Sequence, residues 1–233
     1  MRRLFTQAKN LLLDILFPRI CFSCRRLTLN NQVLCSDCLS SLIINSALLC
    51  PTCHARQPNP SYRCHPQESF FLGSATNYNS PAIKKMVHLF KFNSYEIISD
   101  FFANLLFAYL KKLNFNYQDF ILTSIPLSSS RKRQRGFNQS ELIARRLSQK
   151  INLPYIETLQ RTRDTKPQST LPLLVRAQNL KNCFSVLNPE LIKNKNIILI
   201  DDVFTSGTTI RTAIEELRLH RPQKILALVV AST

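Results

Sequence analysis

Several features are scarce or missing in this sequence of 233 residues. Only three glycines occur, Gly73, Gly136 and Gly207, and neither a Walker-type Gly-Lys-Ser/Thr motif nor a Rossmann glycine triplet is present, which excludes the two commonest phosphate-binding loops. No run of about 18 apolar residues exists, so the sequence does not support a membrane span. The apolar stretch near the N-terminus is short, contains Asp14 and lacks a small-residue cleavage site before Cys21. We therefore expect no signal peptide and a cytoplasmic protein.

Acidic residues are also few, because 14 Asp and Glu stand against 31 Lys and Arg, for a net charge of +17. The excess is uneven: residues 126–181 contain 12 basic and 3 acidic residues and so hold +9 of the total. Such a segment attracts polyanions, whether pyrophosphate or nucleic acid. For any single Lys or Arg within it, a plain basic surface that aids solubility is the alternative.

The stretch 197–209 contains the most informative pattern. Its four large aliphatic residues, 197–200, are typical of a strand buried on both faces, as in a parallel sheet. Asp201 and Asp202 follow at the carboxyl end of that strand, where open α/β sheets bind their ligands. The small residues Thr205–Thr209 lead into a helical pattern over 210–217, and such a turn presents backbone N–H groups to an anion. We expect a sugar phosphate here, with its phosphate on the turn and its hydroxyls on the two acids; an acidic turn that merely caps a helix is the alternative.

Strand and helix patterns alternate along most of the remaining chain. Strands are predicted at 70–78, 119–125 and 224–231. Ser80 and Pro81 begin one helix, a strongly apolar helix covers 94–113, and a third runs from Asn138 to about position 150. This alternation predicts an α/β fold with a parallel sheet flanked by helices.

A basic segment, Arg131–Arg135, follows the strand predicted at 119–125 and is expected to form a loop on the same rim as Asp201. Asn138 and Glu141 form a capping box at the start of the next helix. Arginine makes paired hydrogen bonds to phosphate oxygens, which makes this segment a candidate for binding pyrophosphate. A nucleic-acid patch and a plain basic turn remain open.

The segment 161–180 is long, basic and contains two prolines. A loop of this length inside a compact domain is usually functional, for example as an active-site lid. Lys166, Gln168 and Arg176 are its candidates to reach over a bound substrate. Cys183 stands alone and is expected to be a buried apolar thiol rather than a nucleophile.

Seven cysteines between positions 21 and 64 follow the CxxC spacing of zinc ribbons. Two CxxC turns complete a tetrahedral zinc site, and a reducing cytosol disfavours disulfides. The first set is complete; the second has three cysteines, and a fourth at the same spacing would fall on Gln67. We expect one zinc and leave a second open, with His54 or His65 as its fourth ligand. The first set is Cys21, Cys24, Cys35 and Cys38, and the second is Cys50, Cys53 and Cys64.

These patterns divide the chain into three parts. Residues 1–18 are predicted to form an amphipathic helix that ends at Pro18 and packs on the neighbouring domain, with a membrane-surface or partner-binding role as the alternative. Residues 19–68 form the zinc-ribbon domain, and residues 69–233 form the α/β domain.

In combination these motifs resemble the ComF competence family (ComFC/GntX type), whose members join an N-terminal zinc ribbon to a type I phosphoribosyltransferase domain. The resemblance covers nearly the whole chain, and all thirteen positions of 197–209 resemble the signature for phosphoribosyl pyrophosphate (PRPP). Gln67 departs from the family pattern, which often has another cysteine there. The other residues that carry the resemblance are the CxxC pairs, Arg133–Leu142, Thr165–Gln168, Arg176 and Asn179.

The resemblance implies a type I phosphoribosyltransferase-like sheet and a role in natural transformation, in which imported single-stranded DNA is handled at the inner face of the membrane. The implied partners are PRPP, single-stranded DNA and proteins of the competence machinery; the implied cofactors are zinc and Mg²⁺ with PRPP. The implied PRPP-binding residues are Asp201, Asp202, Val203, Phe204, Thr205, Ser206, Gly207, Thr208 and Thr209, and the implied catalytic residues are Asp201, Asp202, Lys166, Arg133 and Arg135.

Two functions follow from these patterns. The first is a phosphoribosyltransferase with an unknown acceptor, in which catalysis is mostly electrostatic and positional. The second is a non-catalytic adaptor of the DNA-uptake machinery that binds a phosphorylated ribose and nucleic acid. Tight single-strand binding needs aromatic stacking, and Phe137 is the only aromatic residue in the densest basic run.

Overall fold

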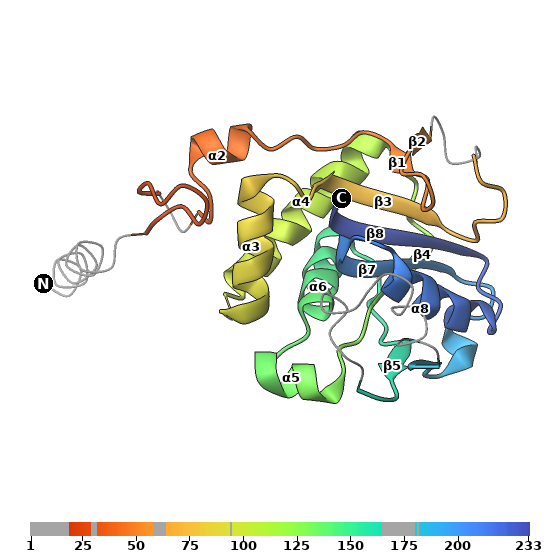
Figure 1. Ribbon diagram of the computed structural model, residues 1–233. Coiled ribbons are helices and arrows are strands. Elements are labelled where there is room, and N and C mark those ends of the chain that lie inside the picture. The colour runs from red at the N-terminus through yellow and green to blue at the C-terminus, as the bar shows by residue number, and fades with distance from the viewer. Residues whose placement is uncertain (1–18, 29–31, 58–63, 94, 165–179, 181) are drawn as a thin grey trace, which may run out of the picture.

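The computed structural model describes all residues except 1–18, 29–31, 58–63, 94, 165–179 and 181. Its centre is a six-stranded sheet with the order β2-β1-β3-β8-β7-β4 (Figure 1). The four long strands run parallel, whereas the short β1 and β2 pair antiparallel at one edge. The strands of this sheet are β1 (Leu48–Leu49), β2 (Arg56–Gln57), β3 (Phe71–Asn77), β4 (Phe120–Ser124), β7 (Asn196–Phe204) and β8 (Lys224–Ser232).

Helices cover both faces of the sheet, and alternate residues of the central strands separate the two cores. Ile198 and Ile200 of β7 point into one core, whereas Ile197 and Leu199 point into the other. This alternation follows from the period of two along a strand, and it explains why the central strands are apolar without interruption over 197–200 and 225–231. The helices are α3 (Pro81–Phe92), α4 (Ile97–Leu113) and α6 (Gln139–Ile151) on the first face and α8 (Thr208–Arg218) on the second.

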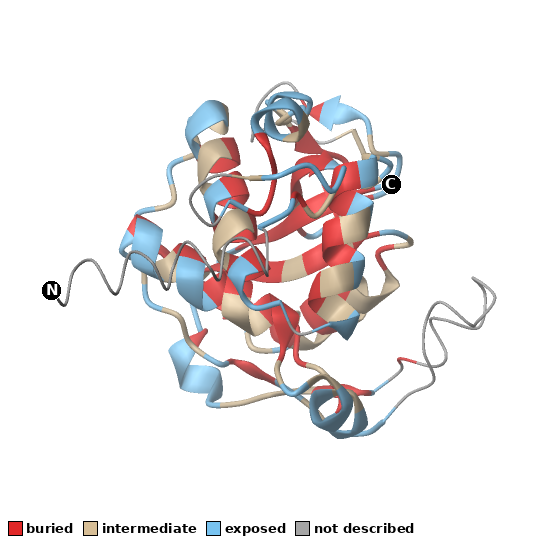
Figure 2. Cartoon of the chain, turned by 90° about the vertical axis from the view of Figure 1, so that its left-hand side faces the viewer, coloured by how far each residue is buried: buried red, intermediate tan, exposed pale blue. Residues whose placement is uncertain are grey.

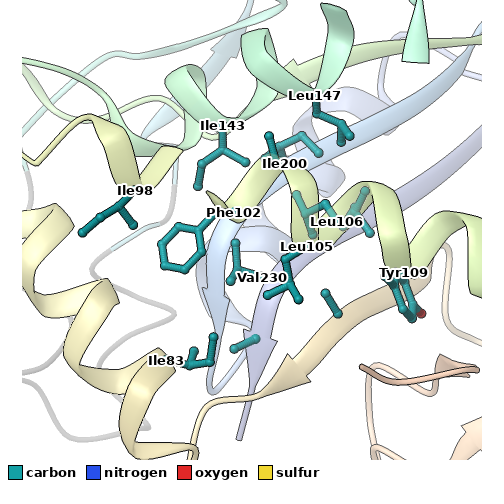
Figure 3. Close-up of a cluster of buried hydrophobic side chains, with 14 of the residues drawn as sticks. Ile83, Ile98, Phe102, Leu105, Leu106, Tyr109, Ile143, Leu147, Ile200 and Val230 are labelled. Atoms are coloured by element: carbon teal, nitrogen blue, oxygen red, sulfur yellow. The ribbon is translucent and has the colours of Figure 1, made fainter. Parts of the chain in front are cut away.

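The core under α3, α4 and α6 is the larger of the two. In Figure 3, Phe102 of α4 and Ile143 of α6 lie against Ile200 of β7 and Val230 of β8. Figure 2 shows that burial is concentrated in the strands and in the inward sides of the helices. The parallel sheet is thus packed on both faces, and the carboxyl ends of its strands lie on this packed scaffold.

The remaining described elements are short. The helix α2 (Ser36–Ser40) lies in the cysteine-rich region, and α5 (Ser129–Arg135) follows β4. A separate two-stranded sheet pairs β5 (Leu159–Arg161) with β6 (Phe184–Val186), and a 3₁₀ turn, η2 (Pro189–Leu191), precedes β7. Within the described residues, no helix has both the length and the apolar character that crossing a bilayer demands.

The sequence-based expectation of an α/β fold with a mostly parallel sheet is confirmed. The strands predicted at 70–78, 119–125 and 224–231 lie within one or two residues of the observed bounds of β3, β4 and β8. The helix predicted from position 94 begins at Ile97. Cys183 is fully buried, as expected for an apolar thiol. The helix predicted at 1–18 lies outside the described residues.

Two local predictions differ from the structure. The basic segment 131–135 was expected to be a loop but forms most of the helix α5, which ends at Gly136 in the left-handed region (φ 81°). The side chain of Asn138 caps α6, as predicted, by accepting a hydrogen bond from the backbone N–H of Ser140. Glu141, the other member of the predicted capping box, instead accepts a hydrogen bond from Arg145 Nε at 2.9 Å. The i,i+4 ion pair on the helix surface thus engages that carboxylate.

Candidate functional site

The two acids of the 197–209 stretch lie at the carboxyl end of β7. The strand was expected to end before them, but it continues to Phe204, because β8 extends beside it as far as Ser232. The neighbour on the other side, β4, stops opposite Ile200. Beyond that residue β7 is therefore paired on one side only, and Asp201 and Asp202 stand where the sheet opens.

Asp201 is held by two hydrogen bonds to its Oδ1 atom. Ser140 Oγ donates from the start of α6 at 2.8 Å, and the backbone N–H of Asp202 donates at 2.9 Å. Burial, which removes water from the carboxylate, and the negative charge of Asp202 together raise the pKa of Asp201 to about 7. The hydrogen bond from Ser140 and the positive charge of Lys91 act in the opposite direction. A carboxyl with a pKa near neutrality is typical of a functional site.

Asp202 has a cationic partner that the sequence did not reveal. Lys91 Nζ, from the last turn of α3, lies 2.7 Å from Asp202 Oδ2, and the Asp202 side chain is 10% exposed. No local motif marks Lys91, because α3 and β7 are more than 100 positions apart in the chain. The position of Lys91 is fixed by the packing of α3 on the sheet.

The turn after β7 is shaped by Gly207. Its φ of 72° lies in the left-handed region, and a Cβ atom placed there would approach Phe204 Cζ to 2.3 Å. Only glycine fits this turn without a shift of the Phe204 ring. The turn opens α8, so its N–H groups and the helix dipole point toward a small hollow of about 40 Å³. This hollow is lined by Asp201 and the residues 203–210.

Arg135 of α5 is the arginine of this helix that lies near the two acids. Desolvation lowers the pKa of Arg135 from its usual value, while the nearby charges of Asp202 and Asp201 oppose that shift. Arg135 Nη1 also donates to Gln139 Oε1 at 3.1 Å, which fixes the guanidinium over the start of α6. Arg133 is exposed on the same helix, and Asp164 feels its charge.

The structure thus brings together Asp201, Asp202, Arg135 and the turn 203–209. Arg133 shares their rim but faces solvent. Lys166, Gln168, Arg176 and Asn179 lie outside the described residues. Ser140 and Lys91 were missed by the sequence analysis. For Ser140 a signal was present, since it lies inside the segment that resembles the family.

The cysteines form two clusters. In the first, Cys21, Cys24, Cys35 and Cys38 bring their sulfurs within 4.8 Å of one another, with Cys24 and Cys35 3.6 Å apart. Four ligands bound to one zinc in a tetrahedron are about 3.5–3.8 Å apart. The geometry of this cluster therefore fits the structural zinc site that the CxxC spacing predicts.

The second cluster contains Cys50, Cys53, Cys64 and His65. His65 Nδ1 lies 3.3 Å from Cys50 Sγ and 3.4 Å from Cys64 Sγ, and Cys53 and Cys64 are 3.6 Å apart. His54 is directed instead at the carbonyl oxygen of Thr233. The choice that the sequence left open thus falls on His65, and the four atoms fit a Cys₃His zinc site.

The second cluster packs against the turn that opens α8. Arg211, in the first turn of α8, donates to the backbone carbonyl of Pro51 at 2.8 Å and forms an ion pair with Glu68 at 2.7 Å. The His54 ring lies 5.5 Å from the Phe204 ring, and His54 Nδ1 lies 2.9 Å from the carbonyl oxygen of Thr233. The loop that contains the second cysteine cluster is thereby in contact with both ends of the Gly207 turn.

Comparison with known proteins agrees with this geometry. Residues 133–233 match the phosphoribosyl transferase domain family, and residues 12–66 match the double zinc ribbon domain family. The DNA utilization protein YhgH of Salmonella typhimurium is 31% identical over 204 residues, covering 83% of this chain and 88% of that protein. The competence protein ComFC of Bacillus subtilis is 30% identical over 196 residues, covering 78% and 77%.

Among solved structures, a hypoxanthine phosphoribosyltransferase from Staphylococcus aureus matches 59% of this chain and 65% of its own, with 13% identity and a TM-score of 0.36. The sequence relatives show the family, because each is at least 30% identical and its match spans more than three quarters of this chain. The chain therefore belongs to the ComF family, in which a double zinc ribbon is joined to a domain of the type I phosphoribosyltransferase fold.

Proposed function

We propose that the rim at the end of β7 binds PRPP together with Mg²⁺, in a protein that handles imported single-stranded DNA during natural competence. The observation that carries the PRPP site is the placement of Asp201 and Asp202 directly before a left-handed glycine turn that opens a helix. The competence role is supported by the relatives named competence protein ComFC and DNA utilization protein YhgH.

Each part of PRPP has a chemically matched group on the rim. The N–H groups and hydroxyls of Thr205–Thr209 receive the 5′-phosphate at the positive end of α8. Asp202 and Asp201 accept hydrogen bonds from the ribose hydroxyls. Arg135, with Arg133 beside it, faces the pyrophosphate, whose oxygens suit a guanidinium; Lys166 is a further candidate for this role.

Catalysis at such a rim is electrostatic. As pyrophosphate leaves C1, positive charge develops on the ribose and negative charge on the leaving group. The carboxylates of Asp201 and Asp202 stabilise the positive charge on the ribose, and the arginines of α5 stabilise the negative charge on the leaving pyrophosphate. Mg²⁺ supplies further neutralisation of the pyrophosphate, and it needs few protein ligands because it retains several waters. Lys91 holds the Asp202 side chain in one orientation through the 2.7 Å contact.

The test is PRPP binding by calorimetry and pyrophosphate release, each measured with and without Mg²⁺. Asp202→Asn should weaken PRPP binding, because the ribose hydroxyls lose a carboxylate acceptor, and should abolish pyrophosphate release, because an amide does not carry the charge that the ribose cation requires. Asp119→Asn, the same change at an exposed position before β4, is the matched control and should leave both unchanged. Absence of PRPP binding by the unmodified protein, measured with Mg²⁺ present, would refute the PRPP site.

The second candidate is the non-catalytic adaptor, and the Lys91–Asp202 ion pair favours it. Lys91 already neutralises part of the charge of Asp202, so less negative charge is available to stabilise a ribose cation. The Asp202 carboxylate can still accept a hydrogen bond from a ribose hydroxyl. PRPP binding without pyrophosphate release, across a panel of acceptor bases and in the presence of single-stranded DNA, would select this candidate.

A further inference from the structure

Two exposed aromatic side chains lie at the end of α3 and in the connection to α4. Phe92 is 59% exposed and Tyr95 is 44% exposed. In the described part of the chain they are the two aromatic members of the set of large apolar side chains that face solvent. Exposing such a surface is unfavourable, so an exposed aromatic pair is a candidate contact for a ligand.

Each of the two rings has partners from a distant part of the chain. The Arg135 guanidinium of α5 lies 5.4 Å from the centre of the Phe92 ring, and the His88 ring lies 4.8 Å from it. The Tyr95 ring lies 5.1 Å from the ring of Phe22, which stands between two ligands of the first cysteine cluster. Because Phe92 and Tyr95 are only three positions apart, three segments that are distant in sequence meet near the end of α3. We call this set of side chains the aromatic strip: Phe22, His88, Phe92, Tyr95 and Arg135.

Basic side chains lie at both ends of the aromatic strip. At one end, α5 contains four basic residues and no acid. At the other end, Arg19 and Arg25 are exposed beside the first cysteine cluster, and Lys85 Nζ donates to the carbonyl of Ser23 at 3.0 Å. Two acids lie nearby: Asp37 pairs with Arg26, whereas Glu96, next to Tyr95 in the sequence, is exposed. A polyanion lying along the strip would therefore meet positive charge at each end.

The aromatic strip also reaches the rim of the sheet. Phe92 directly follows Lys91, whose Nζ contacts Asp202. Arg135 contributes both to the strip and to the electrostatic environment of Asp201 and Asp202. A ligand on the strip therefore lies next to the proposed ribose site rather than on a remote face.

We propose that the aromatic strip binds single-stranded DNA, with unpaired bases stacked on Phe92 and Tyr95 and with phosphates on α5 and on the arginines of the first cysteine cluster. This deepens the proposed role in DNA handling and rests on it. Aromatic rings accept any base, because every base has a π face, whereas the basic side chains bind the backbone. Duplex DNA is a poor ligand for the rings, since its bases are already stacked on one another.

The test uses the full-length protein and a fluorescent single-stranded oligonucleotide of about 20 thymidines, with binding followed by anisotropy over a series of salt concentrations. Phe92→Leu and Tyr95→Leu should each weaken binding about fivefold to a hundredfold, the range expected for the loss of one stacked base. The slope of affinity against salt should stay the same, because no phosphate contact is removed. The conservative variants Phe92→Tyr and Tyr95→Phe retain a ring and should bind as the unmodified protein does.

A matched control is Phe107→Leu on α4. Phe107 also has a cation over its ring, since Lys111 Nζ lies 4.5 Å from the ring centre, but it is not part of the strip. This variant should bind DNA with unchanged affinity. Circular dichroism and zinc content show whether each variant is folded. An oligonucleotide that contains 2-aminopurine adds a direct reading of stacking, because its fluorescence should be quenched by the unmodified protein and less so by the two leucine variants.

Unchanged affinity in the Phe92→Leu/Tyr95→Leu double variant would overturn the proposal, as would an equal loss of affinity for duplex DNA or a changed salt slope. PRPP binding is measured on the same samples and should be retained by the leucine variants. If the unmodified protein binds the oligonucleotide through the strip but does not bind PRPP, the PRPP site is refuted and the strip stands. If it binds PRPP but no oligonucleotide, the strip and the DNA-handling role are refuted and the PRPP site stands.

Discussion

The raised pKa of Asp201 makes a prediction about stability. Its pKa is raised from 3.8 to about 7 in the folded protein, so between these values the folded state holds a proton that the unfolded state has released. The free energy of unfolding therefore falls as pH rises from about 4 to about 7, by about 1.4 kcal/mol for each pH unit between the two pKa values and at most about 4 kcal/mol in all. Asp201→Asn removes this loss, because a neutral amide has no charge to desolvate. Asn Oδ1 still accepts the hydrogen bonds from Ser140 and from the backbone N–H of residue 202.

The assay is thermal unfolding of the two proteins at pH 4.5 and pH 8. If about half of the maximum loss of about 4 kcal/mol is realised, the free energy of unfolding of Asp201→Asn at pH 8 exceeds that of the unmodified protein by about 2 kcal/mol. This difference corresponds to a rise in Tm of about 4–8 °C for a protein of this size. The gain should be much smaller at pH 4.5. The exposed Asp119→Asn serves as the control, with the same difference in Tm at both values of pH. A gain that does not depend on pH, or a loss of stability at pH 8, would refute the argument.

Three further predictions concern the turn, the metals and the basic helix. Gly207→Ala should lower Tm and abolish PRPP binding, because the new Cβ collides with Phe204 in a left-handed turn; Gly136→Ala, where φ is 81° but no atom lies within 4 Å of the new Cβ, should lower Tm by less and retain PRPP binding. Mass spectrometry of the intact protein should find two zinc ions per chain, of which His65→Ala loses one and His54→Ala loses none; one zinc in the unmodified protein would exclude the second site. Replacing the three arginines of α5 with alanine should weaken binding of single-stranded DNA and reduce its salt dependence, and an unchanged slope would remove α5 from the interface.

The contact between the second cysteine cluster and α8 gives this cluster a role beyond its own loop. Arg211 joins the first turn of α8 to Pro51, inside the CxxC turn of the cluster, and to Glu68, three residues after His65. The Glu68 carboxylate also accepts a hydrogen bond from Thr52, inside the CxxC turn. Because a zinc knuckle fixes loops that a small core could not hold, a metal bound here would also stabilise the Gly207 turn.

Local sequence was sufficient for much of the fold. The apolar runs of β7 and β8 are long enough to be buried on both faces, and that property requires helices on each side and hence an α/β sheet. The CxxC spacing predicts the first cluster because a four-residue turn places two thiolates on one side of a metal. Asp201, Asp202 and the turn after them are contiguous in the chain, so they could be recognised together.

Other features depend on chain segments that meet only in the folded protein. Lys91 reaches Asp202 from a helix more than 100 positions earlier, and Ser140 reaches Asp201 from a third element. Neither contact has a local pattern, because each depends on how α3 and α6 pack on the sheet. The selection of His65 over His54 was decided in the same way, since both lie next to a cysteine in sequence and only the path of the chain directs one ring to the cluster.

The surface proposed to bind single-stranded DNA shows the difference most clearly. The sequence by itself determined that the chain is basic and that its densest basic run contains a single aromatic residue, Phe137. The tertiary structure decided that Phe92 and Tyr95 lie exposed beside the basic helix α5 and the first cysteine cluster. Charge adds up along any stretch of chain and can be counted from composition, whereas a stacking surface requires rings and cations at fixed distances, and those distances are set only when the helices pack.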